Sequence, residues 1–277
     1  GADTTGAPST TPTGSLDYTA VCDIAIEADR QFWQWNNSSV TQTQNDITTV
    51  MNQVDFIYDR DCDVNYQVVS LIVTTTTVYT TNDSSTLLSQ FTNFWNINNS
   101  GIQRDIAHLF TGRNLSGSTI GIAYLSTVCS QSNGYGLSQS DFTNNLSSRV
   151  GLTCHELGHN FGAEHTHEYC PPIDTCTSNC TGSNTCSLGT LMSYCHSCGG
   201  MNSVDLRFHP QVSNIMRSRV DASCLGDATM QAGDTIQYRL RFAPRSGAGV
   251  KNATLDVEHD AVNAPSPFTI NVTGVAQ

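Results

Sequence analysis

Three histidines within residues 154–165 place the strongest constraint on how this chain can fold. The segment reads Cys-His-Glu-Leu-Gly-His-Asn-Phe-Gly-Ala-Glu-His. On a helix, His155 and His159 are one turn apart and project from the same side. Gly162 lacks a Cβ and can adopt a positive φ, so the chain can leave the helix sharply at this point. The pattern therefore predicts a helix that stops at Gly162 and a turn that brings His165 back beside the other two histidines.

Three neutral imidazoles and one open position describe a catalytic zinc site. We therefore predict that His155, His159 and His165 are the metal ligands. Glu156 lies next to the first ligand but is offset from the ion, where it can hold water, take its proton and later protonate a leaving amine. His167 lies two residues after His165, but the register of the turn favours His165 as the ligand. The competing interpretation is a surface helix whose histidines have other hydrogen-bond partners.

The spacing HExxHxxGxxH resembles the signature of the metzincin zinc proteases. Met192 follows His165 by 27 residues in the sequence Gly-Thr-Leu-Met-Ser-Tyr, which is similar to the metzincin Met-turn. The resemblance implies that Met192 forms an apolar floor beneath the zinc. Among metzincins, the chain is most similar to the adamalysin (reprolysin) family. That similarity rests on residues 105–114 (DIAHLFTGRN), residues 121–124 (GIAY) with Cys129, and the histidine segment itself.

Two positions depart from the adamalysin pattern. The family usually has Asp directly after the third histidine, whereas this chain has Thr166, so the hydrogen bond of that Asp must be replaced or absent. Tyr194 follows Met192 by two residues, as in astacins and serralysins, whose tyrosine at this place lies at the zinc. Tyr194 is therefore either a fifth ligand that swings to support the oxyanion or a side chain packed on its loop.

The hydrophobic pattern is of the α/β type. Strand-like segments alternate with segments of helical periodicity. The predicted strands are 17–27, 65–75 and 119–128, and the predicted helices are 40–58, 87–95, 142–161 and 211–220. The resemblance implies a twisted mixed α+β sheet with an active-site helix. It also implies a zinc cleft between a larger N-terminal subdomain (17–162) and a smaller, disulfide-rich C-terminal subdomain (163–225). Residues 119–128 are expected to form the edge strand beside that cleft, where an extended peptide can add.

The two ends of the chain differ from this domain in composition. Residues 1–16 are rich in Pro, Thr and Gly and are expected to be a flexible arm. They lack a signal-peptide pattern, so we interpret the sequence as the mature form of a secreted protein. Residues 226–277 lack cysteine and alternate like strands at 234–242, 254–257 and 268–272, which predicts a short β unit.

Eleven cysteines indicate an oxidising compartment and a disulfide framework. Six of them lie in the loop-like residues 166–200, where stapling disulfides are favoured over a structural zinc knot. The family resemblance implies a Cys129–Cys224 pair. Cys22 and Cys62 are the other cysteines of the N-terminal part, and we expect them to pair. The number is odd, and Cys154 is a candidate for the unpaired thiol.

Charge and hydropathy exclude several classes of partner. The formal charge is −12, with 24 acidic and 12 basic residues, which disfavours nucleic acid as a partner. No apolar run is long enough to span a membrane. The acidic balance is compatible with Ca²⁺, but no EF-hand-like loop supports it.

The sequence therefore predicts a secreted, monomeric zinc endopeptidase that acts on extended polypeptides, with Glu156 as general base. Two other interpretations stay open. One is a non-catalytic binding module on a metzincin scaffold, against which the intact Glu156 argues. The other is a disulfide-rich structural protein without a metal.

Overall fold

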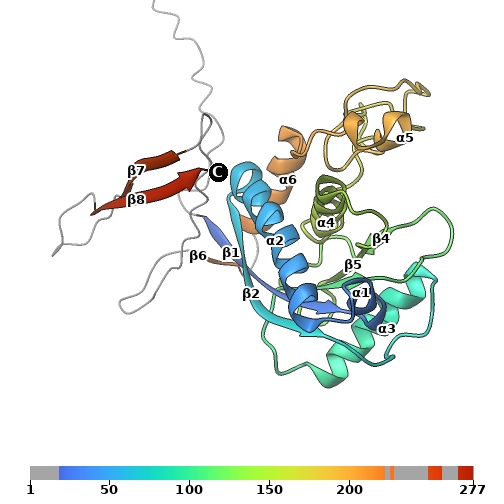
Figure 1. The fold of residues 1–277 in the computed structure, drawn as a ribbon. Helices are drawn as coiled ribbons and strands as arrows, with labels where there is room; N and C mark the ends of the chain where they lie inside the picture. Colours follow the sequence, from blue (N-terminus) through green and yellow to red (C-terminus); the bar gives the residue numbers. More distant parts are fainter. Residues whose placement is uncertain (1–18, 222–224, 228–248, 258–267, 277) are drawn as a thin grey trace, which may run out of the picture. The chain divides into compact units, whose positions relative to one another are not determined.

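The computed structural model of the chain describes residues 19–221, 225–227, 249–257 and 268–276 (Figure 1). The chain divides into two compact units, Gly1–Thr229 and Met230–Gln277, and each is described by itself. The arm predicted at 1–16 and the strand predicted at 234–242 lie outside the described residues. Among the helices described, none combines the length and the apolar character needed to cross a membrane.

A mixed sheet forms the centre of the first unit, with the strand order β2-β1-β3-β5-β4. The strands β2, β1, β3 and β5 run parallel, whereas β4 runs antiparallel to β5. A short strand, β6, pairs antiparallel with β1. The bounds are β1 Ala20–Ala28, β2 Val64–Val73, β3 Ile106–Thr111, β4 Gly121–Ala123, β5 Tyr135–Gln139 and β6 Gly226–Asp227. Because β4 is last in this order, its outer edge has no strand partner among the described residues.

Helices cover both faces of this sheet (Figure 1). Alternate residues of β3 point to opposite sides: Ile106 and Phe110 pack with α2, α4 and α6, whereas Ala107 and Leu109 pack with α3. Each face thus has its own apolar cluster. The helix bounds are α1 Arg30–Trp35, α2 Val40–Cys62, α3 Ser84–Asn98, α4 Leu146–Asn160, α5 His196–Gly199 and α6 Pro210–Asp221, with a 3₁₀ turn at Gly200–Ser203.

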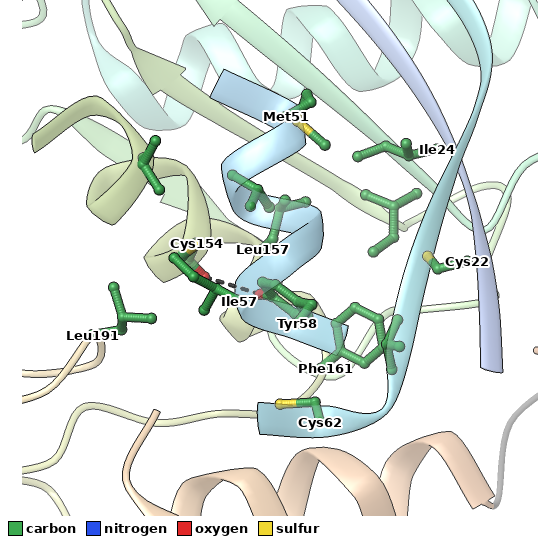
Figure 2. Close-up of a cluster of buried hydrophobic side chains, with 14 of the residues drawn as sticks. Cys22, Ile24, Met51, Ile57, Tyr58, Cys62, Cys154, Leu157, Phe161 and Leu191 are labelled. Atoms are coloured by element: carbon green, nitrogen blue, oxygen red, sulfur yellow. Dashed lines mark hydrogen bonds between the residues drawn. The ribbon is translucent and has the colours of Figure 1, made fainter. Parts of the chain in front are cut away.

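The rear face of α4 is packed against α2 (Figure 2). Leu157 of α4 is fully buried in the same cluster as Met51 and Ile57 of α2. The hydroxyl of Tyr58 donates a 3.0 Å hydrogen bond to the backbone carbonyl of Cys154. This contact satisfies the polar end of a buried aromatic ring within an otherwise apolar layer. The helix that carries the histidine motif is therefore fixed from behind.

The predicted helices are confirmed, with shifted ends. The helix predicted at 142–161 begins at Leu146, because the side chain of Asn145 accepts a 2.9 Å hydrogen bond from the backbone N–H of Ser148 and caps the first turn. The helix predicted at 40–58 continues to Cys62, where Asp63 ends it in the left-handed conformation.

The edge strand is shorter than predicted, because only Gly121–Ala123 of residues 119–128 form β4. After it the chain leaves the sheet and follows the end of α4. The backbone N–H of Ser126 donates to the carbonyl of His159 at 2.8 Å, and the N–H groups of Thr127 and Val128 donate to the carbonyl of Asn160. The last carbonyls of a helix lack partners within the helix, so this segment satisfies them in place of continuing the strand.

Two strands escape prediction altogether. All residues of β3 and β5 are buried, so neither strand shows the alternation of a half-exposed strand. The strands predicted at 17–27 and 65–75 correspond to β1 and β2. In the second unit, the segments predicted at 254–257 and 268–272 fall in β7 (Gly249–Val257) and β8 (Phe268–Ala276), which pair antiparallel.

The expected Cys22–Cys62 disulfide is wrong. Both thiols are free and buried, as is Cys154, so three of the described cysteines are unpaired rather than one. Cys62 ends α2, and its Sγ lies 4.0 Å from the Sδ of Met216 on α6. Cys22 enters the cluster from β1, and the two sulfurs lie apart in Figure 2. The disulfide was predicted only because both cysteines lie in the N-terminal part of the chain. That position does not show that the two side chains pack against different neighbours.

Disulfides staple the loop that follows the histidine motif, as predicted. The bonds are Cys170–Cys180, Cys176–Cys195 and Cys186–Cys198. These six cysteines are therefore not thiolate ligands of a structural zinc. Cys129 is also disulfide-bonded, and its expected partner Cys224 lies outside the described residues.

Burial of His108 on β3 should make the stability of the fold depend on pH. The side chain is fully buried with its Nε2 3.0 Å from Ser138 Oγ, and burial lowers its pKa to about 3. As the pH falls below about 6.5, the unfolded chain gains a proton that the folded chain does not bind, so the unfolded state is favoured. At pH 5 this residue should cost about 2 kcal/mol relative to pH 7.

The measurement is urea denaturation of the wild-type protein and of His108→Gln at both pH values. The difference in the free energy of unfolding between the two pH values should shrink by about 2 kcal/mol in the variant. Asn45→Gln, at an exposed amide of α2 that carries no ionisable group, is the control and should leave the difference as it is. An unchanged difference in His108→Gln would contradict the prediction.

Candidate metal centre

Helix α4 presents two histidine rings on the side away from α2. The ring centroids of His155 and His159 lie 4.9 Å apart. The Nδ1 of His155 lies 2.7 Å from the carbonyl oxygen of Leu191, and the Nδ1 of His159 lies 2.7 Å from that of Ala163. A carbonyl oxygen can only accept, so each Nδ1 carries the hydrogen and each Nε2 keeps its lone pair.

The turn after α4 brings the third histidine to the same place. Gly162 has φ +88°, a conformation that side chains with a Cβ rarely adopt. The ring of His165 then lies 5.1 Å from that of His155 and 4.8 Å from that of His159. Its Nδ1 lies 3.0 Å from the Oε2 of Glu168, which orients this ring as the carbonyls orient the other two.

The three histidines suit a divalent ion such as zinc. One ligand atom of each residue lies within 4.8 Å of the others. Burial, reinforced by the neighbouring imidazoles, lowers the pKa of His155 to about 3 and that of His165 to about 4. Burial also lowers the pKa of His159. All three rings are therefore neutral near pH 7, which is the form that binds a metal. The structure thus brings together the three ligands that the sequence predicts.

Glu156 lies beside the triad, against the edge strand. The side chain is 5% exposed, and a Cβ placed on Gly121 of β4 would collide with its carboxylate. Only glycine allows the carboxylate to come so close to this strand. Burial raises the pKa of Glu156 to about 8. A divalent cation beside it would act in the opposite direction and favour the ionised carboxylate.

Met192 packs against α4, the helix that carries two of the three histidines. It is fully buried, and a Cβ on Gly158 would lie 2.8 Å from its Sδ, so glycine permits the close packing of the turn on α4. The carbonyl of Met192 accepts a 3.1 Å hydrogen bond from the backbone N–H of Thr166. The turn is thereby joined to the residue that follows the third histidine.

Tyr194 lies over the loop histidines rather than over α4. Its ring centroid is 4.5 Å from that of His165, 5.0 Å from that of His167 and 6.2 Å from that of His155. Burial, with the nearby carboxylates of Glu156 and Glu168, raises the pKa of its hydroxyl. Its role at the metal stays a prediction.

The ring of His167 stacks on that of His165 at 5.4 Å with an interplanar angle of 10°. His167 is not part of the triad that His165 forms with His155 and His159. The turn at Gly162 thus brings His165 beside His155 and His159, and its role as the third ligand stays a prediction.

A cavity of about 1080 Å³ opens at the triad. Residues of β4 line it together with the exposed faces of α4 and the turn at Tyr194. Part of its lining is apolar and includes Phe142, Leu152 and Met201. The free edge of β4 therefore borders a space large enough for a peptide segment.

Sequence reasoning missed the groups that orient the ligands. The carbonyls of Leu191 and Ala163 have no signature in the sequence, because any residue supplies a carbonyl. Glu168 carries a weak signal, since it lies three residues after His165 and can reach back to its ring within one turn of chain.

Comparison with known protein families agrees with this geometry. The sequence pattern of the reprolysin type of metallo-peptidase family M12 matches residues 18–205. The chain belongs to metallo-peptidase family M12. The match extends from β1 to beyond the turn at Met192 and so includes every residue of the candidate metal centre. The resemblance to the adamalysin/reprolysin metzincins is confirmed, and the mixed sheet and the disulfides of this M12 chain are consistent with it.

Individual M12 relatives include mammalian and snake proteins. The chain is 30% identical over 161 residues to disintegrin and metalloproteinase domain-containing protein 19 of Mus musculus, covering 57% of this chain and 17% of the relative. It is 31% identical over 147 residues to zinc metalloproteinase-disintegrin-like brevilysin H2a of Gloydius brevicauda, covering 51% and 34%. It is 44% identical over 61 residues to the snake venom metalloproteinase trimerelysin-2 of Protobothrops flavoviridis, covering 22% and 30%. The chain thus spans about a third or less of the length of these relatives.

A solved structure described as a chaperone–substrate complex resembles this M12 chain in fold. The TM-score is 0.52 at 14% identity, with 76% of this chain and 36% of the other covered. At this identity the likeness concerns the fold alone.

The purified M12 chain should bind one equivalent of zinc through the triad. We expect His159→Asn to abolish stoichiometric binding, because two imidazoles leave the ion without a tridentate site. His209→Asn, at a histidine outside the triad, should retain the full equivalent. Elemental analysis after dialysis against buffer with a trace of zinc measures both. An equal zinc content in wild type and His159→Asn would show that the ion binds elsewhere.

Proposed function

We propose that this chain is the catalytic part of a secreted zinc endopeptidase that hydrolyses peptide bonds of extended polypeptides. The observation that carries the proposal is the convergence of three imidazoles, each with its Nδ1 held by an oxygen, beside the buried carboxylate of Glu156. This donor set is that of catalytic zinc sites with three protein ligands and an open position. The names of the relatives, which include zinc metalloproteinases, support the same activity.

His155, His159 and His165 would hold the ion. Zinc bound there would act as a Lewis acid that polarises the scissile carbonyl and lowers the pKa of water. The three Nδ1–H groups donate to the carbonyls of Leu191 and Ala163 and to the carboxylate of Glu168. These hydrogen bonds fix the tautomer and raise the basicity of each ligand.

Glu156 performs the proton transfers in this proposal. Its carboxylate takes a proton from the attacking water and then delivers it to the nitrogen of the leaving amine. Packing against Gly121 leaves the carboxylate at the boundary between α4 and the edge strand. A peptide lying along β4 would therefore present its scissile bond beside this group.

The edge of β4 is the proposed binding site for the main chain of the substrate. Gly121–Ala123 pair with β5 on one side and line the cavity. An extended peptide can add to a sheet edge through main-chain hydrogen bonds, which are the same for any sequence. This supports polypeptides as the substrate class.

The proposed catalytic domain comprises residues 17–225, with the cleft between subdomains 17–162 and 163–225. The residues that the mechanism uses all belong to one chain, which supports a monomer as the active unit. The disulfides support an oxidising, extracellular location. Residues 226–277 would then be an accessory β unit.

Removal of the general base should separate chemistry from metal binding. We expect Glu156→Gln to keep zinc and the fold but to lower kcat/KM for a peptide substrate by about 10²-fold or more. Glu164→Gln, at an exposed carboxylate that lines the same cavity, should keep normal activity. Wild-type activity in Glu156→Gln would remove its assignment as the base. Absence of cleavage by the zinc-loaded wild type across a diverse peptide library would instead favour the non-catalytic binding module.

A separate substitution distinguishes the two roles of Tyr194. If its hydroxyl supports the oxyanion, Tyr194→Phe should lower kcat by about 10²-fold with little change in KM. If the ring only packs against His165 and His167, the phenylalanine keeps that packing and the activity. We expect the first result, because the ring lies 4.5 Å from that of His165 and lines the same cavity. Steady-state kinetics with a fluorogenic peptide decides between them.

A further inference from the structure

The residue after the third ligand is joined to a carboxylate from further along the chain. Thr166 is fully buried, and its hydroxyl donates a hydrogen bond to the Oδ2 of Asp174. The backbone of Thr166 is held on both sides: its N–H donates to the carbonyl of Met192, and its carbonyl accepts from the N–H of Ile173 at 2.9 Å. The hydroxyl also lies 3.3 Å from the carbonyl oxygen of Met192. Thr166, the residue next to His165, is therefore held through its N–H, its carbonyl and its side chain.

Asp174 is buried at 8% exposure and reaches a third segment. Its Oδ1 accepts a 3.2 Å hydrogen bond from the backbone N–H of Cys176. Cys176 is disulfide-bonded to Cys195, three residues after Met192. Asp174 thus joins the loop of the third ligand to both the disulfide and the turn beneath the metal.

A second metal site does not explain why the carboxylate of Asp174 is buried. Its carboxylate and the sulfurs of Cys176 and Cys195 lie within 4.8 Å of one another, a spacing that a metal ion could use. The two sulfurs are bonded to each other, so neither is available as a thiolate ligand. Among the described residues, Asp174 also forms no ion pair with Lys or Arg. The carboxylate of Asp174 instead accepts hydrogen bonds from the hydroxyl of Thr166 and the backbone N–H of Cys176.

We propose that Asp174, acting through Thr166, is a positioning residue for the third metal ligand and replaces the aspartate that adamalysins usually carry directly after that histidine. This inference rests on the proposed function, because it takes His165 to bind zinc. The hydroxyl spans the gap between the backbone beside His165 and a carboxylate eight residues later. Glu168 orients the ring of His165, and the Thr166–Asp174 pair holds the backbone from which that ring projects.

The position of His165 in the chain explains why contacts from other segments are needed to hold it. His165 follows the glycine turn and belongs to no helix or strand, and the backbone contacts within its own segment are those with Glu168. The carboxylate of Glu168 accepts from the N–H of His165 at 2.9 Å, and the N–H of Glu168 donates to the carbonyl of His165 at 2.9 Å. Shifting a ligand by a fraction of an ångström weakens a metal site, because the distances tolerated lie within about 0.2 Å. A buried hydrogen bond to a charged group is about twice as strong as one between neutral groups, which suits it to hold this position.

The test measures zinc affinity of the full chain, by competition with a chromophoric chelator. Thr166→Val removes the donor and Asp174→Ala removes the acceptor, and each should weaken zinc binding by about 10- to 100-fold. Thr166→Ser retains the hydroxyl and should bind zinc as the wild type does. Thr175→Val is the matched control: Thr175 lies in the same loop and its hydroxyl donates to the carbonyl of Thr185, but it does not contact the ligand segment. It should leave the affinity unchanged.

A reciprocal exchange tests the pair itself. Thr166→Asp alone places two carboxylates against each other, and Asp174→Thr alone leaves two hydroxyls, so each should weaken zinc binding. The double variant Thr166→Asp/Asp174→Thr restores one hydroxyl and one carboxylate, and most of the lost affinity should return. The absorption spectrum of the Co²⁺-substituted protein reports the coordination geometry, which a merely structural role of the pair would leave as in the wild type.

The outcomes separate the two proposals. If wild type binds one equivalent of zinc and folded Thr166→Val and Asp174→Ala bind it equally tightly, the positioning role is overturned and the proposed function stands. If wild type binds no zinc, the proposed function fails first, and the positioning role fails with it. Should Thr166→Val or Asp174→Ala unfold, Asp174→Asn keeps the side-chain volume and should still weaken binding about tenfold. An unchanged affinity in Asp174→Asn would then contradict the proposal.

Discussion

The candidate metal centre depends on three imidazoles, each of which has one ligand atom within 4.8 Å of the other two. The other nitrogen of each imidazole donates its N–H to an oxygen, and in His155 and His159 that oxygen is a backbone carbonyl. A neutral ring of fixed tautomer is a ligand, whereas a protonated ring would repel the ion. The positions of Leu191 and Ala163 therefore matter as much as the histidines, since their carbonyls decide which nitrogen of each ring is left free to bind an ion. The rest of the structure holds these partners in place.

Close approach of backbone to side chains makes the centre compact. Gly121 lets the carboxylate of Glu156 lie against the edge strand, and Gly158 lets Met192 pack directly beneath α4. At either position a Cβ would push the two groups apart. The helix, the edge strand and the turn thus approach each other more closely than elements with side chains at these points could. The same closeness brings the free edge of β4 to the cavity where a peptide would lie.

The end of α4 serves two purposes at once. Its last carbonyls accept hydrogen bonds from the segment after β4, which shortens that strand and ties it to the helix. The side chain of Asn160 adds donors to the carbonyls of Tyr124 and Tyr135, at 2.9 and 3.1 Å. These hydrogen bonds therefore hold α4 and the edge strand in a fixed arrangement. Any peptide that adds to β4 would be registered against the histidines by these contacts.

The sequence by itself indicated the three histidines that converge, Glu156 beside them, the helix that carries His155 and His159, and the turn at Gly162, because all of these depend on spacing within one short segment of the chain. It also indicated the stapled loop, since six cysteines in a short, polar segment have little other use. It did not reveal β3 and β5, whose complete burial removes the alternation that marks a strand. Nor did it reveal that Cys22 and Cys62 are unpaired. Only the tertiary structure decided those points, along with the carbonyls that orient the rings and the Thr166–Asp174 hydrogen bond. Each of them depends on contacts between segments that lie apart in the chain, and no local pattern encodes which segments will meet.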